Sequence, residues 1–169
     1  MPPPLTHAAA HAVTYRPGTE EDVPFFGAVY MSTRTEEVAQ TGWPAEMQAA
    51  FLQHQHEAQH SHYRNAYPDA ERLVIERNGE AVGRLYLEEF ASEFRIIDIA
   101  FVPQARGQGL GEAILRDIHE LASAKGKPVS IHVEKNNPAR RLYVRLGFEP
   151  KADAGVYDLM EWAPATSEI

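Results

Sequence analysis

The chain has 169 residues, of which 44% are hydrophobic and 24% are charged, so it is long and apolar enough to bury one sizeable core. The formal net charge of −8 argues against a footprint on duplex nucleic acid, which requires a basic face. The absence of cysteine excludes a disulfide framework, a thiolate metal site and a cysteine nucleophile. No window approaches the roughly 18 consecutive apolar residues of a membrane span, and we expect a cytoplasmic protein that does not bind a membrane.

The two ends of the chain are predicted to lie outside the folded domain. Residues 1–12 lack the basic start and the long apolar stretch of a signal peptide, and we interpret them as a flexible N-terminal extension. Residues 163–169 are interpreted as a flexible tail. Between them we find no internal repeat and no second boundary, so residues 13–162 are predicted to form one domain.

Five segments in the first half of the chain carry the pattern of a strand or a helix. In chain order they are a strand over 13–16, a helix from 19 to about 31, a longer helix over 45–63, and two strands over 72–77 and 81–89. The last two strands flank Asn78-Gly79, the dipeptide that a two-residue type I′ turn favours because both of its positions need positive φ. These two strands are therefore predicted to form a hairpin.

In the second half of the chain, strands and helices alternate. In chain order they are a strand over 95–102, a helix that starts near 110 and ends at Gly126, a strand over 128–134, a helix opened by Asn137-Pro138 that stops at Gly147, and final strands at 148 and over 156–162. Because strands come mostly first and helices are interspersed, the order predicts an α/β domain with a mixed sheet that helices cover on both faces.

The segment Gln104-Ala-Arg-Gly-Gln-Gly-Leu-Gly111 lies between a predicted strand and a predicted helix. Its three glycines at alternate positions let successive backbone N–H groups turn toward one point without interference from a Cβ. The start of the following helix adds its positive end, so the segment is predicted to cradle a pyrophosphate. Leu110-Gly111-Glu112 lacks the Gly-Lys-Ser/Thr of a Walker loop, and Glu112 stands where a dinucleotide fingerprint needs glycine, so neither of those nucleotide sites fits.

The same segment resembles the acyl-CoA signature of the GCN5-related N-acetyltransferase (GNAT) superfamily, Gln/Arg-x-x-Gly-x-Gly/Ala. A second segment, from Asn136 to Phe148, is similar to that family's signature Asn-x-x-Ala-x-x-Leu-Tyr-x-x-x-Gly-Phe at every position. The resemblance covers about forty residues of the chain. It implies an α+β fold, a single GNAT-like domain whose mixed, mostly antiparallel central sheet is flanked by helices on both faces.

The resemblance implies that the protein transfers an acetyl group from acetyl-CoA to a primary amine, and it assigns roles to residues of the donor site. The backbone of Ile99, Ala100 and Phe101 would pair with the pantetheine arm and polarise the thioester carbonyl. Asn136 would hydrogen-bond the pantetheine. The pyrophosphate would be held, mainly through main chain, by Arg106, Gly107, Gln108, Gly109, Leu110, Gly111 and Glu112.

Two side chains are implied in the chemistry. Tyr143 would lie near the sulfur of the bound donor and protonate the departing thiolate, and the alternative is a core tyrosine on an amphipathic helix. The attacking amine must lose a proton, and Asp98 is the first candidate because an aspartate in such an apolar strand is costly unless it is useful or paired. A salt bridge from Asp98 to Arg95 or Arg84 is the equal alternative. Without a cysteine, we expect direct attack on the thioester rather than a covalent acyl-enzyme.

A rival motif lies on the helix predicted over 45–63. His56-Glu-Ala-Gln-His60 matches His-Glu-x-x-His, which places two imidazoles one turn apart for zinc and would define a hydrolase. The metzincin continuation is absent after His60, and no second helix offers an obvious glutamate ligand, so we expect no metal requirement. A solvated helix with Phe51 and Leu52 packed inward, or adventitious metal binding, are the simpler interpretations.

The sequence leaves the acceptor open between a small-molecule amine and a peptide amine. An acidic net charge is compatible with a cationic acceptor, and equally with a role in solubility alone. A non-catalytic module that senses acyl-CoA would carry the same donor site and is the alternative to an enzyme. Dimers are frequent among GNAT proteins, so a homodimer is a further expectation.

Overall fold

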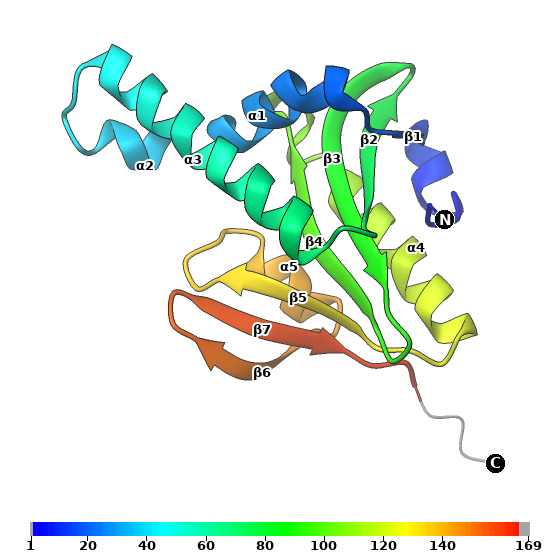
Figure 1. Cartoon of the computed structure of the whole chain (residues 1–169). Helices are drawn as coiled ribbons and strands as arrows, with labels where there is room; N and C mark the ends of the chain where they lie inside the picture. Colours follow the sequence, from blue (N-terminus) through cyan, green and yellow to red (C-terminus); the bar gives the residue numbers. More distant parts are fainter. Residues whose placement is uncertain (1, 166–169) are drawn as a thin grey trace.

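The structure, a computed structural model, describes residues 2–165 (Figure 1). Within these residues, seven strands form one sheet in the order β1-β2-β3-β4-β5-β7-β6. The strands are β1 (Val13–Pro17), β2 (Glu71–Arg77), β3 (Glu80–Glu89), β4 (Phe94–Phe101), β5 (Val129–Glu134), β6 (Glu149–Ala154) and β7 (Tyr157–Trp162). Only β4 and β5 pair in parallel, and the other neighbouring strands pair antiparallel, which confirms a mixed, mostly antiparallel sheet.

Helices cover both faces of this sheet, as predicted (Figure 1). On one face lie α1 (Val23–Ser32), α2 (Thr35–Ala39) and the long α3 (Ala45–Ala66), and on the other lie α4 (Leu110–Ala124) and α5 (Arg140–Arg145). Short 3-10 helices are η1 (Ala8–His11), η2 (Glu20–Asp22) and η3 (Pro103–Ala105). No helix in the described part of the chain is both long enough and apolar enough to cross a membrane.

The two faces of the sheet bury two separate apolar clusters. Leu73 and Ile75 of β2 belong to the larger cluster, in which the sheet packs against residues of α4 such as Ile114. Val74, between them in sequence, points the opposite way and packs with Phe26 of α1. This alternation follows from the period of two of a strand, and each fully buried aliphatic side chain contributes roughly 1.5–3 kcal/mol. The apolar cluster on the face under α1 and α3 is the smaller one, so more of that face carries polar side chains.

Part of the N-terminal segment, predicted as a flexible extension over residues 1–12, forms the 3-10 helix η1 over Ala8–His11. Ala8 is completely buried, and η1 packs against α4. The buried carboxylate of Asp117 on α4 accepts hydrogen bonds from the backbone N–H groups of His7 (2.7 Å) and Ala8 (2.9 Å). These bonds satisfy two otherwise unpaired donors at the start of η1. At the other end, residues 163–165 have no secondary structure, and the rest of the predicted tail, 166–169, lies outside the described residues.

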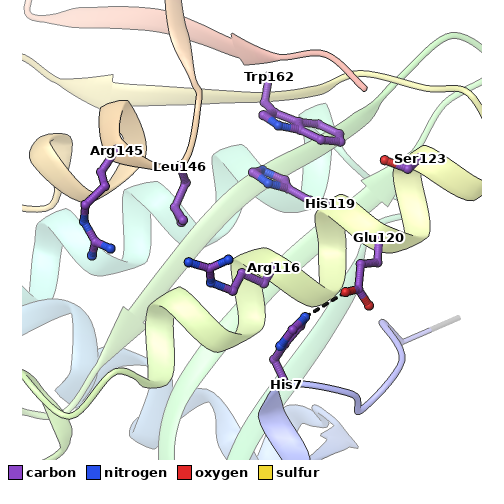
Figure 2. A pocket seen from close by; sticks show the side chains of 8 residues that line it. All are labelled: His7, Arg116, His119, Glu120, Ser123, Arg145, Leu146 and Trp162. Atoms are coloured by element: carbon purple, nitrogen blue, oxygen red, sulfur yellow. Dashed lines mark hydrogen bonds and ion pairs between the residues drawn. The ribbon is translucent and has the colours of Figure 1, made fainter. Parts of the chain in front are cut away.

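A stack of rings fixes the end of β7 to α4. The His119 imidazole lies on the Trp162 indole with ring centroids 3.9 Å apart and planes 5° apart, at the wall of a cavity of about 470 Å³ between α4 and α5 (Figure 2). The Nε2 atom of His119 is buried and has no hydrogen-bond partner among the described residues. Burial, and then the charge of Arg116, lowers the pKa of His119 to about 4.

Because the pKa of His119 is lower in the folded than in the unfolded chain, its proton binds preferentially to the unfolded state. Its stabilising contribution is therefore complete above about pH 6.5 and is lost as the pH falls toward 4. The wild type should lose on the order of 2 kcal/mol of unfolding free energy over this pH range through His119. The variant His119→Phe keeps a flat ring and should not show this loss. Urea unfolding at pH 7.5, 5.5 and 4 measures the difference. Parallel pH dependences in the two proteins would show that His119 is not its source.

Candidate active site

The strands β4 and β5 separate after a short parallel contact. They pair at only three positions, from Phe94 with Val129 to Ile96 with Ile131. Beyond this point β4 continues to Phe101 and pairs with β3 alone, with a register shift that leaves Ile97 as a bulge. The edge of β4 that faces β5 therefore has no strand partner over 97–101, and its N–H and C=O groups need other partners. An extended ligand that carries amides can bind such an edge as an added strand.

The glycine loop lies where this open edge meets the start of α4. Gly107 and Gly109 have φ of +73° and +80°, a region that L side chains rarely adopt, and Gly109 is the N-cap of α4. Gly111 lies close to the Phe101 ring, because a Cβ there would be 3.5 Å from it. The loop thus bends at the positive N-terminal end of a helix of 15 residues, and such a helix end can hold an anion such as pyrophosphate.

Several predicted loop side chains bind the protein itself. Arg106 donates hydrogen bonds to the Phe101 carbonyl (3.1 Å) and to Ser32 Oγ on α1 (2.9 Å). Gln108 donates to the Gln104 carbonyl (2.8 Å). Leu110 is buried in the core. These contacts fit a loop that holds an anion mainly through its main chain.

Glu112, in the first turn of α4, is the one acidic side chain of this segment. Arg145 of α5 donates a hydrogen bond to its carboxylate, and Arg116 lies 3.6 Å away. The hydrogen bond from Arg145, more than the other contacts, keeps the pKa of Glu112 below its usual range. Glu112 therefore joins α4 to α5 beside the predicted pyrophosphate position.

Tyr143 is buried between α5 and the core, with its ring 5.7 Å from that of Phe148 in a T-shaped contact. Burial, and then the negative charge of Asp98, raises its pKa, so the phenol keeps its proton at neutral pH. Asn136 is exposed in the connection from β5 to α5. Its neighbour Asn137 accepts a hydrogen bond from the Ala139 N–H (2.8 Å), which caps the turn before α5 as the Asn-Pro pair predicted.

Asp98 forms the salt bridge that the sequence offered as the alternative to a catalytic role, and its partner is Arg84 rather than Arg95. The Arg84 side chain is only 2% exposed, and it also donates to the Phe26 carbonyl (3.2 Å) and to Gln59 (2.9 Å). A buried guanidinium without a countercharge costs several kcal/mol, so Asp98 is needed to keep Arg84 in place.

Sequence reasoning missed a row of polar side chains on β5. Ser130, His132 and Glu134 alternate with core residues, so they face the side of the sheet that carries α1 and α3. Glu134 is ion-paired with Arg34, which comes from the connection between α1 and α2. Tyr30 packs under the same guanidinium, 5.8 Å from its ring centroid. The alternation of the strand pattern was the signal that could have identified these residues.

The histidines of α3 do not assemble a site with three ligands. His56 is 3% exposed, and its ring packs on Gly27 of α1, where a Cβ would come within 2.9 Å. The His60 ring lies 6.0 Å from it. Phe51 and Leu52 were both predicted to pack inward. Leu52 is buried, but Phe51 is 37% exposed and its ring contacts that of Trp43. In the described part of the chain, the trio of His, Asp or Glu groups close enough for one metal ion is His7, Asp117 and Glu120, beside η1.

An open sheet edge beside a glycine loop at the start of a helix can hold an extended ligand that carries phosphate, and the comparison with known proteins gives the family. Residues 34–148 match the model of the acetyltransferase (GNAT) family. The chain belongs to this family, which confirms the resemblance of its two signatures.

Solved structures with the same fold cover nearly the whole chain. The PaiA N-acetyltransferase of Thermoplasma acidophilum, in complex with coenzyme A, is 15% identical with a TM-score of 0.66 over 89% of this chain and 98% of that one. The ribosomal-protein-S18-alanine N-acetyltransferase of Escherichia coli is 17% identical with a TM-score of 0.56, over 92% and 96% of the two chains. At these identities the likeness concerns the fold.

A relative from Bacillus subtilis carries the provisional name ribosomal protein bS18-alanine N-acetyltransferase. It is 36% identical over 85 residues, which are 49% of this chain and 56% of that protein. The match therefore spans little more than half of the relative's length.

The position of the anion can be tested with a pair of glycine variants. Gly107 and Gly126 both have positive φ and open space around a Cβ, and they lie at opposite ends of α4. Trp at either position carries a similar backbone cost, on the order of 1–2 kcal/mol. Gly107→Trp should fill the cradle and lower CoA affinity at least about 10-fold, about 1.4 kcal/mol, while Gly126→Trp leaves it unchanged. Calorimetric titration with CoA measures this, and equal affinities would place the pyrophosphate elsewhere.

Proposed function

We propose that this protein is an acetyl-CoA-dependent N-acetyltransferase that transfers the acetyl group to a primary amine by direct attack on the thioester. The observation that carries the proposal is the unpaired edge of β4 leading into the glycine loop at the start of α4. Family membership supports it, and so does the coenzyme A bound by the Thermoplasma protein of the same fold.

The donor would lie along the opening between β4 and β5. The backbone of Ile99, Ala100 and Phe101 pairs with the pantetheine amides, and its N–H groups polarise the thioester carbonyl and stabilise the oxyanion. The loop over 106–112 holds the pyrophosphate, and Asn136 hydrogen-bonds the pantetheine. Acetyl-CoA supplies the acyl group, and we propose that no metal is required.

In the reaction, the amine nitrogen attacks the carbonyl carbon and forms a tetrahedral intermediate. The C–S bond then breaks, and Tyr143 donates its proton to the departing thiolate. Its raised pKa means that the proton is present at neutral pH, while transfer to a thiolate needs close contact. Asp98, the sequence-based candidate for the base, has its Oδ2 engaged by Arg84, so we assign it first to positioning this face of the sheet.

We propose a peptide amine as the first acceptor to test, with a small-molecule amine as the alternative. The Bacillus and Escherichia proteins described above are named for the alanine of a ribosomal protein, and acceptors of this kind carry a free N-terminal amine. Action in the cytoplasm, as a monomer or a homodimer and without nucleic acid or membrane, completes the proposal.

Binding of the donor is the first experiment. Chelator-treated protein should bind acetyl-CoA with micromolar affinity in a calorimetric titration, and a parallel zinc titration tests the motif on α3. Absence of acetyl-CoA binding together with tight stoichiometric zinc binding would overturn the proposal. Acetyl-CoA binding without acetyl transfer to any amine of a broad panel would instead identify a sensor module.

The role of Tyr143 can be separated from packing by a matched pair of tyrosine variants. Tyr143→Phe should lower kcat about 10-fold and change acetyl-CoA affinity little, because the phenol acts on the leaving group. Tyr15→Phe, in the same core and with a buried hydroxyl that has no partner in the described structure, is the control and should leave kcat unchanged. Equal losses of kcat and affinity in Tyr143→Phe would indicate a packing role.

A further inference from the structure

His132 stands at the point where β4 and β5 part. Ile131 makes the last parallel pair with Ile96, so His132 is the first residue of β5 beyond that contact, level with the bulge at Ile97. Its side chain projects from the face under α1 and α3, opposite the core side that carries α4. His132 therefore lies at the opening between β4 and β5, across from the unpaired edge of β4 over Ile97–Phe101. It is on the face of the sheet that does not carry α4.

The ionisable side chains around His132 are occupied. On β4, Asp98 binds Arg84, and Arg95 donates to Glu93 at 3.0 Å. On β5 itself, Glu134 binds Arg34 of the α1–α2 connection, and the residue paired with His132 on β7 is the apolar Leu159. The same face also carries Tyr67, which directly follows α3, together with Ser130, Tyr157 and Glu161.

Among the described residues, His132 is left with no hydrogen bond or ion pair to another group, and it is exposed. Partial desolvation, and then the positive charge of Arg95, lowers the pKa of the imidazole, while Glu93 acts in the opposite direction. The imidazole is therefore neutral at pH 7, the form that can accept a proton.

We propose that His132 takes the proton from the ammonium form of the acceptor, which frees the amine nitrogen to attack the thioester. This inference rests on the proposed acetyltransferase function. The freed amine forms the N–C bond, the C–S bond breaks, and the thiolate receives a proton from Tyr143. The second proton leaves the new amide nitrogen and restores the Tyr143 phenol through solvent, and the imidazolium releases its proton to solvent, so the enzyme ends in its starting state.

The test is His132→Gln, which keeps the polarity of the side chain and removes the base. With a short peptide that has an N-terminal alanine, kcat at pH 7 should fall about 100-fold, while acetyl-CoA affinity and the thermal unfolding midpoint stay unchanged. The deficit should shrink with an O-alkylhydroxylamine acceptor, which is largely unprotonated at pH 7. His132→Glu, which restores a proton acceptor, should recover part of the rate.

His54→Gln, a change at an exposed histidine of α3, is the matched control and should keep the wild-type kcat. An active wild type together with unchanged kcat in His132→Gln between pH 6 and 9 would overturn the inference and leave the proposed function standing. An equal loss with both acceptors would also overturn it, because a structural role does not depend on the protonation of the amine. A wild type that binds acetyl-CoA but acetylates neither acceptor would count against the proposed function itself.

Discussion

The parting of β4 and β5 is the constraint on which the rest of the site depends. A sheet interior normally pairs both edges of every strand, and an unpaired run of backbone groups there costs free energy unless a partner replaces the missing strand. Here the antiparallel pairs on either side hold β4 and β5 in place after their three shared pairs. The separation leaves the open edge of β4 beside the loop before α4, where Gly111 lies against the Phe101 ring.

The face opposite α4 is built around a buried charge. Arg84 lies between the rings of Tyr30 and Tyr86, 5.9 Å and 5.1 Å from their centroids, and Asp98 supplies the countercharge. Burial raises the pKa of Tyr86 to about 12, so this phenol stays neutral beside the pair. Replacing one member of a buried ion pair leaves the other charge buried without a partner. The pairing with Arg84 therefore accounts for an aspartate in this apolar strand without any catalytic role.

Features that depend on local chemistry could be predicted, and those that depend on distant contacts could not. The turn at Asn78-Gly79 is confirmed, with φ of +52° and +81°, because its dipeptide determines the backbone. The contact of the segment before η1 with α4 involves Asp117, about 110 residues away, which composition does not reveal. Strand β6 (Glu149–Ala154) was not predicted, because it is exposed at every position and lacks the apolar alternation that marks a strand.

The same distinction explains why the donor could be inferred from sequence and the acceptor could not. The proposed donor contacts are mainly backbone groups, and glycines at fixed spacing are required wherever a chain must bend around an anion, so a short motif identifies them. The opposite face takes its side chains from α1, the α1–α2 connection, β5 and β7, with one or two residues from each. Arg34 and Glu134, for example, meet across 100 residues of sequence. No short motif records such a meeting, so acceptor specificity can differ among proteins that share the donor signature, and it has to be sought in the charges and hydrogen-bonding groups of this face.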